Sequence, residues 1–377
     1  MKIVVVNLNP CVDWQYTVQK YVHGGLNRVS RTRTDIAGKG INVAFALKNL
    51  GLDPLVTGFN FEENGFLLTQ KLDMAGIRHD FVEIPGEIRV NIKMYEEETG
   101  QMTELNQPGA FVPPEARNQL LEKIARHQDI DPPVEACNAN SHRPTDLCRN
   151  TDPPIEVCQA NSNHPPKRGD CDTNIAERFN WCRNILVVSG SRPQGVAADF
   201  YAKICKLHPG KIFLDTEGEA LKIALETAPP FAIKPNLFEL ESLFQKKDLS
   251  DIKVKNFSSP EEIAEICRKK IIPYGVKIVC VSMGAEGAVL VAGDSAENSF
   301  FLPALNLPVK GVAGAGDAMV AGMVYSMAYE ITAPERLLSS GMAAAAASVV
   351  LDGTEMCTAD GFINFGKKLA TPRSCRF

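Results

Sequence analysis

The chain alternates between short continuous runs of apolar residues and longer stretches in which apolar residues recur at helical spacing. Continuous runs, short enough to be buried strands, occupy residues 3–6, 185–188, 211–214, 231–233 and 277–281. Helical spacing is found over residues 42–50, 114–125 and 260–271. Because strands buried on both faces read as continuous apolar runs, this order predicts an α/β fold with a mainly parallel sheet.

Two segments follow a different pattern, in which polar and apolar residues alternate. They cover residues 13–18 and 89–95. A turn at Gly100 connects the second segment to a further strand over residues 102–106. Successive side chains of a strand point to opposite faces, so alternation suits a sheet with one face in water. The pattern therefore predicts a second, smaller sheet.

Composition agrees with an enzyme that has a large core. The chain has 377 residues, of which 45% are hydrophobic and 23% charged, and its formal net charge is −5. We expect one large domain with a smaller appendage. The negative charge argues against a nucleic-acid partner. The apolar runs at the N-terminus and over residues 341–351 are too short for a signal peptide or a membrane span, which predicts a cytoplasmic protein with no membrane partner.

A block over residues 128–174 does not fit the α/β pattern. Within it, residues 131–142 are echoed by residues 152–164, with many prolines and few apolar residues. Such a segment cannot bury a core of its own, which predicts an exposed insertion. A zinc or disulfide clip through its cysteines and histidines is an alternative, although the spacing fits no familiar zinc finger. Four of the eleven cysteines lie here, namely Cys137, Cys148, Cys158 and Cys171.

The segment Gly314-Ala315-Gly316-Asp317 opens an apolar run and carries the clearest chemistry. Glycines let a backbone approach an anion, and the first amides of a helix have no partner within the helix and favour negative charge. Asp317 beside them is suited to accept a proton from an attacking hydroxyl, as phosphoryl transfer requires. A glycine-rich turn capped by an aspartate, with no ligand, is the alternative.

Two other nucleotide-binding motifs are absent. Residues 37–40 lack the upstream glycine and the following serine or threonine of a P-loop, which disfavours a Walker-type NTPase. Residues 314–316 lack the third glycine of a dinucleotide fingerprint, because Met319 stands at that position. A nicotinamide enzyme is therefore disfavoured.

Five motifs in order resemble those of the ribokinase-like (PfkB) carbohydrate kinase family, over nearly the whole chain except the block near 128–174. They are Asn9-Pro10-Cys11-Val12-Asp13, Ala37-Gly38-Lys39-Gly40-Ile41-Asn42-Val43-Ala44, Lys234-Pro235-Asn236-Leu237-Phe238-Glu239-Leu240, Ser282-Met283-Gly284-Ala285-Glu286-Gly287 and Gly314-Ala315-Gly316-Asp317. The first motif and residues 89–93 look most like the 1-phosphofructokinase and tagatose-6-phosphate kinase branch.

This resemblance implies a three-layer α/β/α sandwich with a mainly parallel sheet and a small β-sheet lid over the sugar. The expected core comprises residues 1–8, 34–86, 108–127 and 175–377, and the expected lid residues 9–33 and 87–107. In the family the lid is often part of a dimer contact, which implies a homodimer contact here. Residues 128–174 have no counterpart in the family.

The resemblance also assigns the sugar side of the site. Asp13 and Asn42 are expected to bind sugar hydroxyls, and Gly38 leaves room for the sugar; a strand-end cap and an ordinary helix N-terminal residue are the alternatives. A sugar phosphate also needs cations, because an unpaired anion is costly to desolvate. Arg89 is the preferred cation because it lies on the lid strand, although it could be a solvated surface arginine. The other expected substrate-binding residues are Arg28, Lys39, Asn91 and Lys93.

The nucleotide side is read from the C-terminal motifs. Proline after the apolar run 231–233 ends that strand, so Asn236 and Glu239 are expected at its carboxyl end. The resemblance implies ATP as co-substrate and a Mg²⁺ ion held by Glu239, through water because magnesium dehydrates reluctantly. A plain helix N-terminus and an ordinary tight turn are the alternatives. The expected nucleotide-binding residues are Lys234, Asn236, Ser282, Gly284 and Gly287.

Together these features predict an ATP-dependent kinase that converts a ketose monophosphate to a ketose 1,6-bisphosphate. Fructose 1-phosphate is the first candidate substrate and tagatose 6-phosphate the second; Gly314, Ala315 and Gly316 would hold the transferred phosphoryl group beside Asp317. A catalytically weak relative, used as a scaffold whose insertion binds a partner, is the alternative. Two departures from the family pattern are the segment Gly311-Val312-Ala313, where relatives carry hydroxyl residues, and Arg192, where this branch has an apolar residue.

Overall fold

The computed structural model describes residues 1–128, 184–208, 210–244, 257 and 259–375. The expected insertion over residues 128–174, with its four cysteines and its alternative zinc or disulfide clip, lies outside the described residues except for residue 128. Six cysteines, distributed over the core and lid, are described, and all six are buried free thiols.

The large sheet has ten strands in the order β14-β13-β12-β11-β10-β9-β8-β1-β4-β5. All neighbours from β11 to β5 are parallel, and the pairs that involve β12, β13 and β14 are antiparallel. All five strands predicted from the continuous apolar runs are present. The strands are β1 (Ile3–Asn7), β4 (Leu55–Phe61), β5 (Arg78–Ile84), β8 (Ile185–Ser189), β9 (Lys211–Asp215), β10 (Ala232–Ile233), β11 (Ile278–Ser282), β12 (Ala288–Ala292), β13 (Ser299–Leu302) and β14 (Arg373–Ser374).

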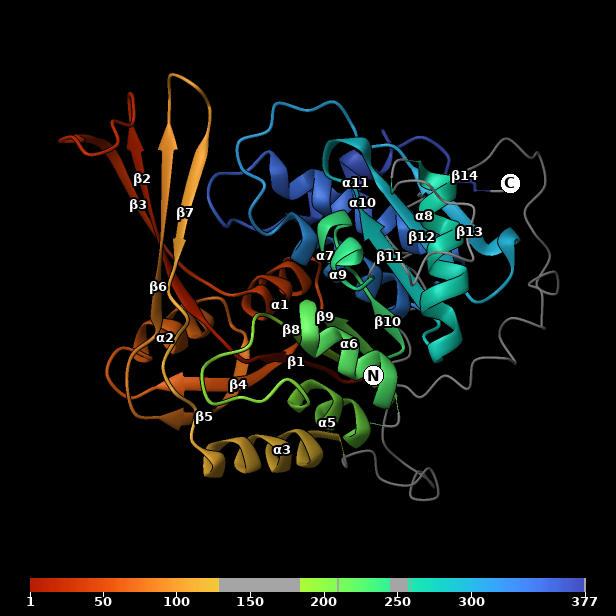
Figure 1. Cartoon of the computed structure of the whole chain (residues 1–377), viewed down its shortest axis with the longest axis horizontal. Coiled ribbons are helices and arrows are strands. Elements are labelled where there is room, and N and C mark those ends of the chain that lie inside the picture. Colours follow the sequence, from red (N-terminus) through yellow and green to blue (C-terminus); the bar gives the residue numbers. More distant parts are fainter. Residues whose placement is uncertain (129–183, 209, 245–256, 258, 376–377) are drawn as a thin grey trace, which may run out of the picture.

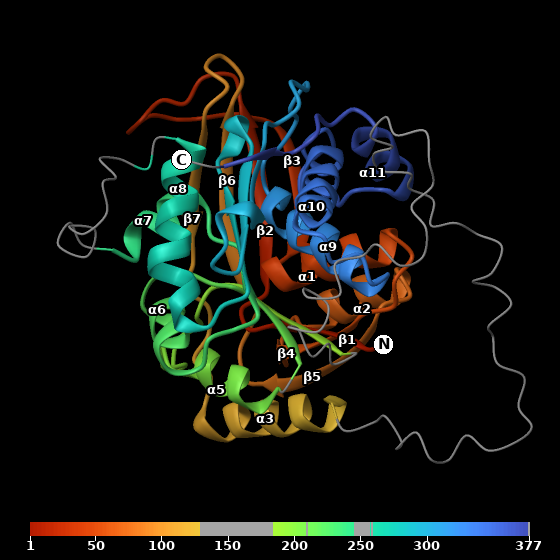
Figure 2. The ribbon, with the colours of Figure 1, turned by 90° about the vertical axis from the view of Figure 1, so that its right-hand side faces the viewer.

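Helices cover both faces of this sheet, as Figures 1 and 2 show. One layer contains α1 (Lys39–Asn49), α2 (Phe66–Met74), α9 (Ala315–Ala328), α10 (Pro334–Val349) and α11 (Ala359–Gly366). The opposite layer contains α3 (Pro114–Gln128), α5 (Phe200–Leu207), α6 (Gly218–Thr227), α7 (Leu237–Ser242) and α8 (Pro260–Ile266). The predicted three-layer α/β/α sandwich is therefore confirmed. The helix expected over residues 260–271 is present as one continuous stretch, in which α8 passes directly into a π-helical segment, Cys267–Ile271.

Helix α9 lies in the interior of its layer. Gly322 on this helix is so close to α10 that an added Cβ would lie 2.2 Å from the Ser340 carbonyl oxygen. Contact at this distance needs a residue without a side chain, which explains a glycine within a long helix despite its conformational cost. None of the described helices combines the length and the apolar character that a bilayer span requires.

A separate four-stranded sheet, which we call the lid, rises beside the core (Figure 1). Its strands are β2 (Cys11–Val18), β3 (Val29–Ala37), β6 (Arg89–Glu96) and β7 (Met102–Asn106), in the order β3-β2-β6-β7. The central pair β2 and β6 is parallel, and the two outer pairs are antiparallel. Strand β3 continues past residue 33, where the sequence placed the end of the lid, because its pairing with β2 extends to Ala37 opposite Cys11.

The two faces of the lid reverse the usual pattern of burial. Asp13 and Asn91 are register partners on one face and are both buried. Trp14, Ile92 and Leu105 form the next row, on the other face, where Trp14 is 38% and Leu105 59% exposed. The sequence correctly predicts a sheet with two different faces, but the buried face is the polar one. A polar face is covered in this way when it is turned toward a polar binding site.

Candidate active site

Polar side chains gather at one edge of the large sheet, where its parallel strands end. Asn7, Ser189 and Asp215 are the last residues of β1, β8 and β9 and are aligned in register. Further along this edge, Asn236 forms a parallel bridge with Ser282 at the end of β11. The carboxyl edge of a parallel sheet is where ligands of open α/β folds bind.

The start of α9 has the backbone geometry expected of an anion cradle. Gly314 precedes the helix in a left-handed conformation with φ 81°, and an added Cβ would lie 2.4 Å from Cε of Met356. Only glycine tolerates both conditions. The amides directly before and after Gly316 and Asp317 donate hydrogen bonds to carbonyls of the preceding turn. Among the described residues, no acceptor is found for the amides of Gly316 and Asp317 themselves. These two amides and the helix dipole make a site suited to an anion.

Asp317 lies in the first turn of α9 and is 5% exposed. Nδ2 of Asn42 donates a hydrogen bond to its Oδ2 at 2.8 Å. Burial and the negative charge of Asp215 raise the pKa of Asp317 to about 6, although Lys39, Asn42 and Lys234 act in the opposite direction. A carboxylate with this pKa is ionised at neutral pH and is a stronger base than an exposed aspartate.

A second buried carboxylate, Asp215, organises the cations of the site. Its Oδ1 lies 3.5 Å from Nζ of Lys234 and 3.7 Å from Nζ of Lys39, and Ser189 donates a hydrogen bond to its Oδ2 at 3.2 Å. Burial raises the pKa of Asp215, but the charges of Lys234 and Lys39 outweigh burial, so the pKa is lowered. Sequence reasoning missed Asp215; the available signal was an acidic residue directly after the apolar run 211–214.

Lys39, predicted to bind the sugar phosphate, lies between two acidic groups at the carboxyl edge of the sheet. It pairs with Asp215 and, at 3.6 Å, with Oε1 of Glu239. The charge of Asp215 raises the pKa of Lys39 and outweighs the effect of burial. Lys39 therefore keeps its positive charge, and this charge also acts on Asp317.

Asn236 and Glu239 form a capping box at the start of α7. The Asn236 amide donates to Oε2 of Glu239, and the Glu239 amide donates to Oδ1 of Asn236, both at 2.8 Å. The structural alternative raised from the sequence is therefore present. The capping box uses only Oε2 of the Glu239 carboxylate. The other oxygen, Oε1, lies near Lys39, so the same carboxylate also takes part in the site.

The donor set of this edge suits Mg²⁺ only if water and phosphate complete its coordination. No group of three histidine, cysteine or acidic side chains that could hold a metal is found among the described residues. Oδ1 of Asp215 is buried at ion-pair distance from Lys39 and Lys234 and accepts no hydrogen bond, so it can still accept one from a water bound to the ion. Magnesium usually keeps several waters and binds through one or two carboxylates plus substrate phosphates, so these residues fit it.

The turn after β11 places Ser282, Gly284 and Gly287 next to this edge. Gly287 has φ 123°, and an added Cβ would lie 2.1 Å from the Leu302 carbonyl oxygen, so the fold alone requires this glycine. Gly284, with φ 58°, has no atom within 4 Å of an added Cβ. The tight-turn alternative therefore explains Gly287, whereas Gly284 faces open space.

The sugar-side residues of the lid are linked to one another. Asp13 accepts hydrogen bonds from Nζ of Lys93 at 2.6 Å and from Nδ2 of Asn91 at 3.0 Å. Lys93 therefore neutralises Asp13 and is not a free cation. Oδ1 of Asn91 is buried and has no partner among the described residues. An unsatisfied buried oxygen is costly, and a ligand hydroxyl would satisfy it.

Asn7, which sequence reasoning did not select, shapes the glycine-rich segment. Its Oδ1 accepts a hydrogen bond from the Gly40 amide at 3.1 Å, and an added Cβ on Gly38 would lie 2.9 Å from the same oxygen. Gly38 and Gly40 are thus required by contact with Asn7. Nδ2 of Asn7 is fully buried and has no partner among the described residues.

The predicted arginines differ in their placement. Arg89 begins β6, donates to the Gln107 carbonyl at 2.9 Å, and has a buried Nε with no partner among the described residues. Arg28 lies exposed between β2 and β3 and makes no ion pair with any described residue. Arg192 is also exposed and, together with Lys39, lowers the pKa of Tyr201, which burial raises. Arg89 thus keeps an unused donor on the lid face that carries Asn91, whereas Arg28 is exposed and unpaired within the described part of the chain.

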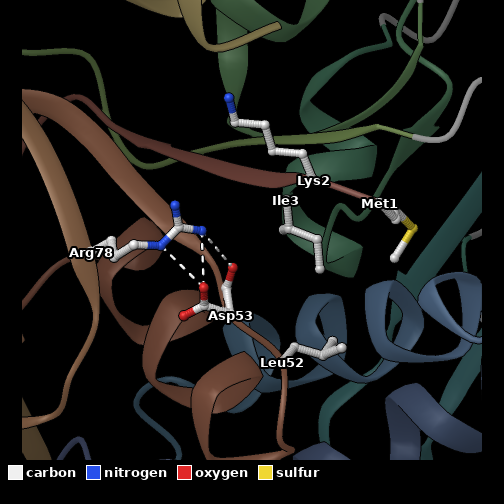
Figure 3. Close-up of a pocket in the computed structure, with 6 residues that line it drawn as sticks. All are labelled: Met1, Lys2, Ile3, Leu52, Asp53 and Arg78. Carbon is white, nitrogen blue, oxygen red and sulfur yellow. Dashed lines mark hydrogen bonds and ion pairs between the residues drawn. The ribbon is translucent and has the colours of Figure 1, made fainter. Parts of the chain in front are cut away.

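A hollow of about 320 Å³ lies at the opposite edge of the sheet (Figure 3). It is lined by Met1, Lys2, Ile3, Leu52, Asp53 and Arg78. Arg78 and Asp53 pair at 3.0 Å, so their charges are already satisfied. Because Ile3 starts β1 and Asn7 ends it, the length of that strand separates this hollow from the carboxyl edge.

Comparisons with known proteins agree with this geometry. A family profile described as "pfkB family carbohydrate kinase" matches residues 2–130 and 170–360. The chain is 30% identical to the 1-phosphofructokinase of Borreliella burgdorferi over 326 residues, which cover 86% of this chain and 84% of that protein. It is also 30% identical to the 1-phosphofructokinase of Rhodobacter capsulatus over 329 residues, with the same coverage.

Solved structures show the same fold. Phosphofructokinase-2 from Escherichia coli in complex with substrates and products matches with a TM-score of 0.74 and 22% identity, over 98% of this chain and 99% of that one. Ribokinase from Thermotoga maritima matches with a TM-score of 0.63 and 18% identity, over 97% and 99% of the two chains. The family resemblance and the ribokinase-like fold predicted from the sequence motifs are confirmed.

Proposed function

Because this chain belongs to the pfkB family of carbohydrate kinases, and is thus an enzyme that transfers phosphate to a sugar, we propose that its substrate is a ketose monophosphate. The reaction would convert fructose 1-phosphate to fructose 1,6-bisphosphate with ATP. The observation that carries the proposal is the buried Asp317, held by Asn42 beside the unpartnered amides at the start of α9. Support for the substrate comes from the relatives named 1-phosphofructokinase.

In the proposed reaction Asp317 removes the proton of the sugar's free primary hydroxyl. The resulting oxygen forms a bond to the γ-phosphorus of ATP while the bond from that phosphorus to the bridging oxygen breaks, and ADP leaves. The amides of Gly316 and Asp317 and the side chains of Lys39 and Lys234 stabilise the negative charge on the transferred group. A Mg²⁺ ion held through water by Glu239 and Asp215 would supply further positive charge at the phosphates.

The lid would orient the sugar for this attack. Asp13 and Asn91 offer hydrogen-bonding groups on its buried polar face, and Arg89 offers a charged donor for the phosphate that the substrate already carries. Closing this polar face over the sugar would exclude water, so that ATP phosphorylates the sugar and is not hydrolysed.

Measuring ADP release with a coupled assay on four acceptors tests the proposal. The acceptors are fructose 1-phosphate, tagatose 6-phosphate, fructose 6-phosphate and an unphosphorylated ketose. We expect the highest kcat/KM with fructose 1-phosphate; a higher value with tagatose 6-phosphate would favour the second substrate. A folded protein that turns over none of the four would contradict the kinase proposal and favour a scaffold.

We also propose that the apolar face of the lid forms a homodimer contact. Trp14, Ile92 and Leu105 form a row across three strands of that face, and none of the three is fully buried. Apolar side chains gathered on one exposed face are typical of an interface, and a second copy of the same sheet offers a matching surface.

Sedimentation velocity on the full chain tests the dimer. We expect the wild type to sediment as a dimer and Leu105→Lys to sediment as a monomer at the same concentration, because a buried lysine in the contact would be unpaired. Lys20→Glu, an exposed change elsewhere on the lid, is the matched control. A monomeric wild type at high micromolar concentration would refute the contact.

A further inference from the structure

One loop of the core touches both the lid and the anion cradle. This connecting loop, residues 351–357, joins α10 to α11. On one side Glu355 pairs with Arg33 of lid strand β3, with Oε1 and Nη2 3.1 Å apart. On the other side Met356 packs against Gly314, whose added Cβ would lie 2.4 Å from its Cε. A displacement of the loop would therefore change both its contact with the lid and its contact with Gly314.

Arg33 lies on the same face of the lid as Asp13, one register row away, where it is the partner of Gln15. Asp35 is the register partner of Asp13 across β2 and β3, so their side chains lie side by side on one face. Like charges in this position repel each other, and each has its own cation. Arg33 binds Asp35 through Nε at 2.8 Å and Nη2 at 3.2 Å, and Lys93 binds Asp13 at 2.6 Å.

In the core, the connecting loop is held against the elements that carry the site. Gly353, with φ 61°, brings its backbone so close to the lid that an added Cβ would lie 2.4 Å from Nε of Arg33 and 2.5 Å from Oδ2 of Asp35. The Met356 carbonyl accepts a hydrogen bond from Nδ2 of Asn49 at 3.3 Å. Asn49 ends α1, the helix that carries Lys39 and Asn42. The loop is thus tied to the lid, to α1 and to the start of α9.

We infer that the Arg33–Glu355 ion pair couples sugar binding on the lid to the geometry of the phosphate cradle, which makes both side chains positioning residues. The inference rests on the proposed function. Sugar bound at Asp13 fixes the lid, and with it Arg33; Arg33 then holds Glu355 and the connecting loop, so that Met356 is seated on Gly314. Neither residue touches a reacting atom in this scheme.

The strength of the pair suits such a role. Its side chains are 28% and 58% exposed, so the attraction is weak and screened by salt. Because Asp35 already fixes the guanidinium of Arg33 through two hydrogen bonds, little side-chain freedom is lost when Glu355 joins. A contact of this kind forms and breaks readily as the lid closes and opens.

Calorimetric titration measures the coupling without turnover. The affinity of a non-hydrolysable ATP analogue is measured with and without saturating fructose 1-phosphate, and the ratio of the two dissociation constants is the coupling factor. In the wild type we expect the sugar phosphate to tighten nucleotide binding, and in Glu355→Gln we expect the coupling factor to fall by on the order of threefold. The wild-type factor should also fall toward the mutant value when the salt concentration is raised.

The control is Glu98→Gln, which removes an ion pair of similar length, to Lys20 at 3.4 Å, entirely within the lid. It should leave the coupling factor unchanged. In a double-mutant cycle, Glu355→Gln should cause no further loss of coupling in a chain that already carries Arg33→Gln, because the partner of Glu355 is then absent. In kinetics, Glu355→Gln should raise KM for the sugar phosphate more than it lowers kcat.

The outcomes separate the inference from the function on which it rests. A wild type that binds no sugar phosphate overturns the proposed function and the inference with it. A wild type that binds and phosphorylates the sugar, but whose coupling factor is unity or is unchanged in Glu355→Gln, overturns the inference alone. Equal losses of coupling in Glu98→Gln and Glu355→Gln would also overturn it, because a general effect of lid charge would then explain both.

Discussion

The core sheet and the lid use their polar residues in opposite ways. In β1, four apolar residues are followed by a single buried asparagine, Asn7, at the carboxyl end, and β9 ends in the same way with Asp215. In the central strands of the lid, the buried Asp13, Asn91 and Lys93 share one face, while Trp14 and Leu105 on the other face are exposed. The core is thus stable through its apolar interior and carries chemistry only at its edge. The lid has little apolar surface to bury and depends on its own ion pairs, on ligand and on the proposed dimer contact.

The largest expected effect follows from changing the core edge at Asp317. Asp317→Asn should lower kcat on the order of a hundredfold or more, because the amide cannot accept the proton of the sugar hydroxyl. Thermal unfolding should show a fold that is intact and somewhat more stable at pH 8, since burial of the ionised carboxylate is removed. Asp360→Asn, an exposed acid in the first turn of α11, is the matched control. Activity of Asp317→Asn near that of wild type would refute the role of this residue.

The pH profile of the wild type sharpens the same point. Asp317 has a pKa raised to about 6, so kcat/KM should fall as pH drops through about 6, where the base becomes protonated. The contribution of this group to the free energy of unfolding changes with pH in the opposite direction. The native state binds this proton more tightly than the unfolded state does, so this group lowers the free energy of unfolding as pH rises from about 4 to about 6. A profile that is flat from pH 5 to 8 would contradict the assignment.

An intermediate effect is expected from the lid. Asp13→Ala should raise KM for the sugar phosphate by on the order of tenfold or more and leave KM for ATP nearly unchanged, because it removes a sugar contact and leaves the buried Lys93 without its partner. The comparison of the two KM values is the measurement. Thermal unfolding in parallel detects any loosening of the lid, and Asp13→Asn, which keeps the size of the side chain, should retain more of the affinity. Equal increases in both KM values would show that Asp13 does not act on the sugar side alone.

The smallest expected effect is a shift in the pH profile caused by Asp215→Asn. The negative charge of Asp215 raises the pKa of Asp317, so in Asp215→Asn the acidic limb of the kcat/KM profile should move to lower pH. The same change frees Lys39 and Lys234 from a common partner, which lowers the pKa of Asp317 further. Comparing the midpoints of the two profiles is the measurement. A limb that moves to higher pH would mean that a different group titrates.

The sequence predicted more about the core sheet than about the lid. In the core, continuous apolar runs located all five predicted strands, and the glycines before Asp317 located the cradle. In the lid, alternation correctly predicted a two-faced sheet but not which face is buried, because period-two spacing contains no information about what covers each face. Asp215 was missed for a related reason. A lone acid after an apolar run resembles any strand end, and its importance comes from Lys39 and Lys234, which lie far from it in sequence.

The partners of individual charged residues were likewise not predictable from the sequence. The sequence offered Lys39 and Lys93 as cations for a sugar phosphate; the structure pairs Lys93 with Asp13 and places Lys39 between Asp215 and Glu239. Charged side chains have long reach, so spacing along the chain does not determine which partner each one finds.

By itself, the sequence determined the α/β pattern, the five core strands marked by continuous apolar runs, the family, and the chemistry offered at the start of α9, because backbone propensity, burial pattern and glycine geometry are local properties. Only the tertiary structure decided the pairing of the buried charges, the raised pKa of Asp317, the inverted faces of the lid and the contact of Glu355 with Arg33. Each of these depends on distances between residues tens to hundreds of positions apart, and electrostatic interaction depends on distance and burial in space.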